Sequence, residues 1–123
     1  MTERRQRLGR RGEDLAAEWY QHHGWTVLDR NWRCARGEID LIVGRNPDGR
    51  RSRWREIAIV EVKARSSSRY GSGFDAVDPR KQARLRRLGA RWLAEWAGST
   101  RVVRFDVVEV DARGTLRVRE GCF

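Results

Sequence analysis

The sequence contains few cysteines and prolines and has no long apolar run. It has two cysteines and two prolines in 123 residues. Because Cys34 and Cys122 are far apart and lack the spacing of metal ligands, we expect free thiols and no zinc site. No segment approaches the roughly 18 apolar residues of a membrane-spanning helix. The residues after Met1 are charged, so we expect no secretory signal and a cytoplasmic protein.

Positive charge is abundant, but lysine is scarce. The formal net charge is +10, which makes a polyanion the expected partner, with nucleic acid favoured over a membrane surface. Of the 27 basic residues only Lys63 and Lys81 are lysines, which leaves 25 arginines. Arginine keeps its proton in a protein, whereas lysine can release it. We therefore interpret Lys63 as a residue selected for its chemistry.

Two predicted strands carry acidic residues among apolar ones. Alternation along residues 57–63 puts Glu61 and Lys63 on one face. Residues 37–43 form a second predicted strand, in which Asp40 lies on one face and Ile39 and Leu41 share the opposite face. If the strands are neighbours, Asp40, Glu61 and Lys63 converge. Two carboxylates and a lysine suit a site that binds a hard divalent cation and activates water.

These motifs resemble a known family of nucleases. Gly37-Glu38-x-Asp40 followed by Glu61-x-Lys63 resembles the signature of the PD-(D/E)XK nuclease superfamily. Residues 11–16, Arg-Gly-Glu-x-x-Ala, and the later Gly24-Trp25 narrow the resemblance to the YraN-like (UPF0102) branch, which is similar to archaeal Holliday-junction resolvases. The resemblance extends from about residue 8 to residue 110. Ile39 stands where the superfamily name expects a proline, and this removes no ligand.

The resemblance implies a function and a set of site residues. It implies an endonuclease of DNA, including branched DNA such as junctions, that uses Mg²⁺ or Mn²⁺ and works as a homodimer. Asp40, Glu61 and Glu13 would hold the metal, and Lys63 would orient the attacking water. Gln82 and Lys81, on the helix after the Glu-x-Lys strand, would face the site. From the residues alone, Glu13 is a surface glutamate near a helix N-terminus, and a nucleic-acid-binding module that does not cut is the alternative function.

The expected fold is α/β in a single domain spanning residues 1–123. We expect a restriction-endonuclease-like mixed sheet of about five strands flanked by helices. Residues 1–7 are predicted to be a flexible basic arm. The predicted helices cover residues 8–23 and 79–97, and the predicted strands cover residues 25–30, 37–43, 57–63, 101–110 and 115–119. Residues 44–55 are a basic hairpin tip, and the long loop after Lys63 would close over substrate.

Arginine-rich segments supply candidate DNA contacts. The positions selected are Arg10, Arg11, Arg33, Arg51, Arg53, Arg65, Lys81 and Arg84. Charge runs of this kind are also found on ordinary solvated surfaces, and both interpretations stand at this point. Asp106 is predicted to pair with an arginine as part of the fold and not to bind metal.

Overall fold

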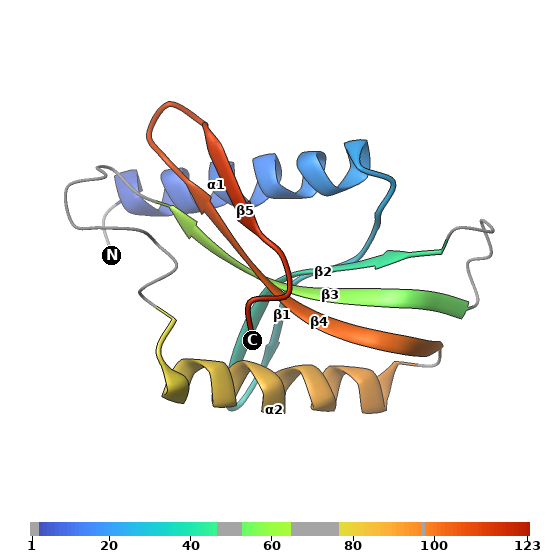
Figure 1. Cartoon of the computed structure of the whole chain (residues 1–123). Helices are drawn as coiled ribbons and strands as arrows, with labels where there is room; N and C mark the ends of the chain where they lie inside the picture. The colour runs from blue at the N-terminus through green and yellow to red at the C-terminus, as the bar shows by residue number, and fades with distance from the viewer. Residues whose placement is uncertain (1–2, 47–52, 65–76, 97) are drawn as a thin grey trace.

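The computed structural model describes residues 3–46, 53–64, 77–96 and 98–123 and contains a mixed sheet flanked by two helices (Figure 1). The elements are α1 (Glu3–His22), β1 (Thr26–Cys34), β2 (Gly37–Arg45), β3 (Arg53–Ala64), α2 (Pro79–Glu95), β4 (Ser99–Val110) and β5 (Leu116–Arg119). This confirms the predicted restriction-endonuclease-like α/β fold. No helix in the described segments is long and apolar enough to cross a membrane.

The sheet follows chain order with one crossover connection. Its five strands are arranged β1-β2-β3-β4-β5. All neighbours are antiparallel except β3 and β4, which are parallel. Because parallel neighbours need a crossover, the chain passes through α2 between them. Figure 1 shows α1 on one face of the sheet and α2 on the other.

Helix α1 begins earlier than the sequence pattern predicts. It starts at Glu3 and takes in residues 3–7, which were assigned to a flexible arm. These residues read Glu-Arg-Arg-Gln-Arg, all with high helix propensity and with no glycine or proline among them. The apolar periodicity that marks the buried part of the helix begins only at Leu8, so periodicity alone sets the start too late.

Strand β3 places its side chains alternately on the two faces, as predicted. Ala58 and Val60 pack in a core with α1 residues such as Ala16 and Tyr20. Ile57 and Ile59 pack on the other face, in a core that includes Leu88 and Trp92 of α2. Each helix therefore covers one apolar face of the strand that carries Glu61 and Lys63.

Two helical glycines lie at different distances from the sheet. A Cβ on Gly12 of α1 would lie 3.5 Å from Val110 and 3.6 Å from Val62, which is ordinary van der Waals contact. A Cβ on Gly89 of α2 would lie 2.4 Å from the Cδ1 of Ile59. A side chain at position 89 would thus require the buried Ile59 side chain to move, whereas one at position 12 would require no movement.

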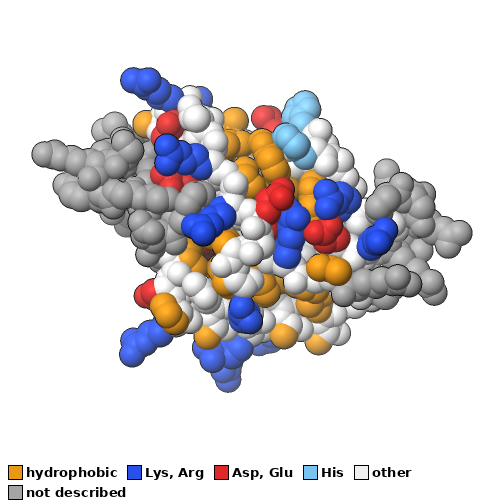
Figure 2. Space-filling model, in the orientation of Figure 1, with side chains coloured by type: hydrophobic (Ala, Val, Ile, Leu, Met, Phe, Trp, Pro, Cys, Tyr) orange, Lys and Arg blue, Asp and Glu red, His pale blue; other side chains and the backbone are white. Residues whose placement is uncertain are grey.

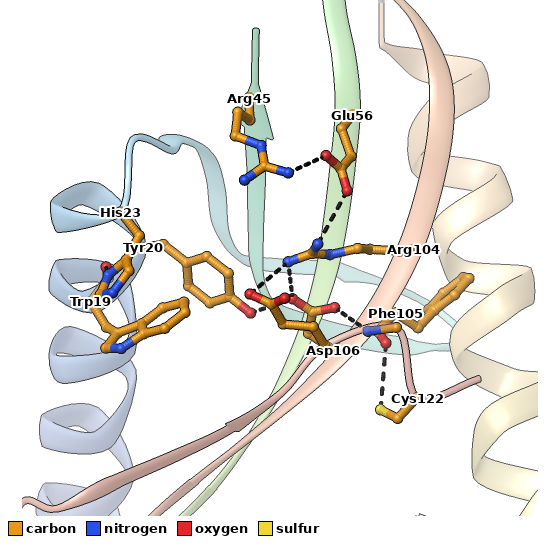
Figure 3. A network of polar contacts seen from close by, with 11 residues as sticks. Trp19, Tyr20, His23, Arg45, Glu56, Arg104, Phe105, Asp106 and Cys122 are labelled. Atoms are coloured by element: carbon orange, nitrogen blue, oxygen red, sulfur yellow. Dashed lines mark hydrogen bonds and ion pairs between the residues drawn. The ribbon is translucent and has the colours of Figure 1, made fainter. Parts of the chain in front are cut away.

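A buried polar network joins α1 to β4 on the face of the sheet that α1 covers (Figure 3). Asp106 is fully buried. Its Oδ2 accepts hydrogen bonds from the Tyr20 hydroxyl at 2.6 Å and from Arg104 Nη2 at 3.1 Å. Its Oδ1 accepts a hydrogen bond from the Gly121 N–H at 2.9 Å. The prediction that Asp106 pairs structurally with an arginine is confirmed.

Arg104 extends this network to a second acid. Its Nη1 lies 3.1 Å from Glu56 Oε1, and Arg45 Nη2 lies 2.6 Å from Glu56 Oε2. The guanidinium groups of Arg45 and Arg104 also lie 4.5 and 4.6 Å from the ring centre of Trp25. Since buried charges are stable only when paired and hydrogen-bonded, the network compensates for the burial of Asp106.

Candidate active site

The proposed site lies where β2 separates from β3. The two strands pair up to Leu41 opposite Val60. Beyond this pair, the side chain of Asp40 accepts a hydrogen bond from the Val62 N–H at 2.8 Å. The Asp40 carboxylate thus takes the place of a backbone carbonyl of β2. The Val62 N–H therefore keeps a hydrogen-bond acceptor where the two strands diverge.

Side-chain alternation in β2 breaks at the same point. Leu41 packs in the α1 core, whereas Ile39 packs in the α2 core. The prediction that Ile39 and Leu41 share one face is therefore wrong. The reason is local: regular alternation requires a continuous ladder, and the ladder to β3 ends at Leu41.

Asp40 is largely buried beside other acidic side chains, and its pKa is raised. Burial raises its pKa, and the nearby negative charge of Glu61 raises it further, to about 7. The hydrogen bond from the Val62 N–H opposes this shift, and Glu13 and Glu38 add smaller repulsions. Glu61 and Glu13 therefore each lie within electrostatic reach of Asp40.

Glu13 is held at the site from α1. Burial raises the pKa of its carboxyl group, opposed by a hydrogen bond with the Asn31 side chain and by the charge of Arg30. Asn31 lies in β1 with a positive φ of 52°, a conformation that asparagine adopts more readily than most residues. Sequence analysis missed Asn31. Its position in an apolar-poor segment between Arg30 and Trp32 gave no sign of a contact with α1.

Glu61 is paired with both lysines. Its Oε1 lies 3.4 Å from Lys63 Nζ and 2.9 Å from Lys81 Nζ. The side chain of Glu61 is only 12% exposed. Burial and a hydrogen bond with Lys81 lower the pKa of Lys63. Lys63 is thus a group that can exchange a proton more readily than a free lysine.

The first turn of α2 brings Lys81 to the site. Asp78 caps the helix by accepting the Lys81 N–H at 2.9 Å, and Pro79 occupies the first turn. Burial acts against the charge of Lys81, but its hydrogen bonds with Glu61 and Lys63 outweigh this and raise its pKa. Gln82 points to the same end of the helix but donates to the Val77 carbonyl at 3.1 Å. This contact caps the helix, and a catalytic role of Gln82 stays a prediction.

The donor set fits a divalent cation held by two carboxylates. In the described part of the chain, no three acidic, histidine or cysteine side chains are grouped closely enough to hold a metal ion. Mg²⁺ is often held by one or two carboxylates, with waters and phosphate oxygens completing its shell. The repulsion between Asp40 and Glu61, seen in the raised pKa of Asp40, is relieved by a cation. These two residues therefore fit Mg²⁺ or Mn²⁺, with Glu13 in support.

Arginines continue from the site along α2. Arg84 is close enough to Lys81 to affect its pKa. A hollow of about 650 Å³ is lined by Asp78, Arg80, Lys81, Ala83, Arg84 and Arg87. A second hollow, of about 290 Å³, is lined by Cys34, Arg36, Arg84, Arg87, Leu88 and Arg91. In Figure 2, blue side chains project along the lower edge, where α2 lies. We call this second hollow the arginine hollow.

The other predicted DNA contacts have different positions. Arg10 and Arg11 are exposed on α1. Arg33 is paired with Glu38 at 3.0 Å on the surface. Arg51 and Arg65 lie outside the described residues, as do residues 47–52 of the hairpin tip and residues 65–76 of the loop after β3. Of Arg53 only the backbone is described, in β3. The structure thus adds Arg36, Arg87 and Arg91 as basic residues near the site that sequence analysis did not select as DNA contacts.

Comparisons with known proteins agree on one family. The model of a family described as "Uncharacterised protein family UPF0102" matches residues 12–110, a range that contains Glu13, Asp40, Glu61 and Lys63. The chain is 50% identical over 112 residues to a UPF0102 protein of Frankia casuarinae, covering 91% of this chain and 88% of the relative. It is 49% identical over 122 residues to one of a Parafrankia species, with coverage of 96% and 97%. A UPF0102 protein of Beutenbergia cavernae is 46% identical over 114 residues, with coverage of 93% and 86%.

Proposed function

The chain belongs to the UPF0102 family, and we propose that it is a Mg²⁺-dependent endonuclease that hydrolyses phosphodiester bonds in DNA. Branched DNA such as a junction is the proposed substrate class. The observation that carries the proposal is the grouping of Asp40, Glu61 and Lys63 at the diverging ends of β2 and β3. Two acids that repel each other beside a lysine of lowered pKa are typical of a site that handles a metal, water and a phosphate.

Each residue has a distinct role in the proposed reaction. Asp40 and Glu61 would hold Mg²⁺ or Mn²⁺, with Glu13 in support from α1. When bound, the cation would supply charge stabilisation at the phosphate and a more acidic water. Lys63 would orient the attacking water and, in the neutral amine form that its lowered pKa makes more accessible, would accept its proton at Nζ. The water oxygen bonds to phosphorus, the bond from phosphorus to the leaving oxygen breaks, and solvent protonates the leaving oxygen.

The basic surface supports DNA as the partner. Lys81, Arg84 and the arginine hollow continue outward from the acidic centre. Positive side chains in this position neutralise backbone phosphates without reading sequence. Cleavage of both strands of a junction in one binding event requires two such centres, so we propose a homodimer. We also propose a cytoplasmic location.

Cleavage assays on defined DNA test the proposal. Purified protein is incubated with labelled four-way junction, flap and linear duplex, with Mg²⁺, with Mn²⁺ or with chelator. We expect metal-dependent cleavage that Asp40→Asn and Lys63→Met each lower by about 100-fold or more, the range seen when an acid–base group is lost. Glu18→Gln, which changes an exposed acid of α1, is the matched control and should cleave normally. Equal cleavage by the wild type and by a protein that carries both site substitutions excludes the proposed centre.

A second candidate function is binding of nucleic acid without cleavage. It is favoured by one observation: Oε1 of Glu61 is already paired with two ammonium groups, so the site is electrostatically satisfied without a cation. In that case the protein binds DNA with salt-dependent affinity, and Asp40→Asn leaves this affinity unchanged. Calorimetric titration with Mn²⁺ separates the two functions, because only the nuclease has a cation site that Asp40→Asn removes.

A further inference from the structure

Both lysines of the chain contact the same atom. Lys63 comes from β3 and Lys81 from the first turn of α2, and each ammonium pairs with Oε1 of Glu61, at 3.4 and 2.9 Å. The remaining 25 of the 27 basic residues are arginines. The chain thus uses arginine on its surface and in its buried network, and lysine only beside Glu61. The argument that Lys63 is present for its chemistry applies equally to Lys81.

The difference between lysine and arginine matters at this carboxylate. A guanidinium group is a planar fork that binds both oxygens of a carboxylate in a fixed geometry. An ammonium group is a compact charge on a flexible stem, and it can contact one oxygen and change partners. The lysine contacts of Glu61 in the described structure are both made to Oε1. A lysine therefore neutralises Glu61 and leaves its second carboxylate oxygen available. An arginine would bind both oxygens.

We propose that Lys81 is an exchangeable counter-ion of Glu61. Its ammonium group neutralises the carboxylate until a divalent cation binds, and then moves from Glu61 to an oxygen of the substrate phosphate. This inference rests on the proposed function, since it assigns Lys81 to the metal-binding centre. It separates Lys81 from the arginine surface, with which sequence analysis grouped it.

The position of Lys81 suits such an exchange better than that of Lys63. Lys63 is two residues from Glu61 on the same strand. Lys81 belongs to a different element, and its backbone is fixed by the Asp78 cap, so its side chain can leave Glu61 while the helix stays in place. It also lines the hollow of about 650 Å³ that contains Arg80, Arg84 and Arg87, so a phosphate in that hollow lies within the span of the lysine side chain.

The proposal predicts opposite effects for two substitutions of Lys81. Lys81→Gln removes a positive charge that competes with the cation, so the affinity for Mn²⁺ should rise about tenfold. Lys81→Arg conserves the charge but engages both oxygens of Glu61, so the affinity should fall about tenfold. A residue that only supports the fold would lower the affinity in both variants or change it in neither. Arg117→Gln, a charge change at an exposed position of β5 away from the hollow, should stay within about twofold of the wild type because its charge is screened by solvent.

Calorimetric titration with Mn²⁺ in the absence of DNA tests the inference, with thermal melting to show that each variant is folded. We expect the order Lys81→Gln, wild type, Lys81→Arg from tightest to weakest binding. The inference is overturned if Lys81→Gln binds Mn²⁺ no more tightly than the wild type, or no more tightly than Arg117→Gln. If the wild type has no cation site, or has one that Asp40→Asn does not remove, the proposed function and this inference are both overturned. A cation site that depends on Asp40 but is unaffected by both Lys81 variants overturns the inference alone.

Discussion

Asp40→Asn should stabilise the protein at pH 8 while it removes the proposed activity. The carboxyl group of Asp40 is partly buried and faces the charge of Glu61, and its pKa is raised to about 7. Its negative form is therefore unfavourable in the folded state. Asparagine is nearly isosteric and neutral, and its side-chain oxygen can still accept the Val62 N–H that Asp40 now accepts.

The magnitude follows from the linkage between pKa and stability. A rise of the pKa from 3.8 to about 7 corresponds to about 4 kcal/mol of lost stability once Asp40 is ionised, at about 1.36 kcal/mol per pH unit. For an acid whose pKa is raised by folding, the folded state binds more protons between these two values, so stability falls as pH rises from 3.8 to 7 and is level above. The asparagine side chain is itself partly desolvated, so we expect a gain of about 2–4 kcal/mol at pH 8. This gain should shrink to less than half at pH 5.

Urea unfolding followed by tryptophan fluorescence measures the effect, with chelator present, at pH 5 and pH 8. Glu18→Gln is the control, because exposed surface substitutions change stability by only about 0.5 kcal/mol. The reasoning is refuted if Asp40→Asn is no more stable than the wild type at pH 8. It is also refuted if the gain is the same at both pH values, since the effect would then come from packing and not from ionisation.

Further predictions concern the core and the basic surface. Asp106→Ala should lower the free energy of unfolding by about 3–5 kcal/mol in the same assay, because its buried hydrogen-bond and ion-pair partners lose an acceptor; a loss below 1 kcal/mol contradicts this. Gly12→Ala should raise the melting temperature by the equivalent of about 0.5–1 kcal/mol, since the helix gains propensity and the added Cβ meets only ordinary contacts. Gly89→Ala should lower the melting temperature despite the same propensity gain, because its Cβ would lie 2.4 Å from Cδ1 of the buried Ile59 and force that side chain to move; equal shifts of both variants contradict the packing described. Arg87→Gln should reduce the slope of log affinity for DNA against log salt by about 0.9, measured by fluorescence anisotropy in chelator, whereas Arg117→Gln on β5 should leave it unchanged.

The parts of the fold that depend on local pattern could be predicted from the sequence. Residues 57–63 alternate as expected, because β3 lies between two paired neighbours and buries both faces. Asp78 and Pro79 mark the start of α2 because capping chemistry acts within one turn. The start of α1 could not be found in the same way. Residues 3–7 extend the helix by propensity and carry no apolar periodicity to signal it.

The parts of the site that depend on contacts between distant residues were harder to predict. Sequence alone could group Asp40, Glu61 and Lys63 by strand alternation and by the resemblance. It could not show that the β2 ladder ends at Leu41, because the divergence depends on how the two strands twist against the helices. Nor could it show which side chain of the first α2 turn reaches Glu61. Neighbouring helix positions differ by about 100° in direction, and Lys81 rather than Gln82 lies on the side that meets the carboxylate.

The arrangement of the sheet explains why the acidic centre lies at this end of the molecule. Since β3 and β4 are parallel and joined through α2, the carboxyl end of β3 and the amino end of α2 lie at the same edge of the sheet. Ligands of open α/β sheets bind beyond such carboxyl ends, and free N–H groups of a helix start favour phosphate there. Three unusual groups lie at this edge. They are Asp40 with its raised pKa, Lys63 with its lowered pKa and Glu61, whose carboxylate pairs with both lysines. By contrast, the buried acid Asp106 has its hydrogen bonds supplied by Tyr20, Arg104 and Gly121. The raised pKa of Asp40 and the lowered pKa of Lys63 thus lie at the edge where the proposed reaction would take place.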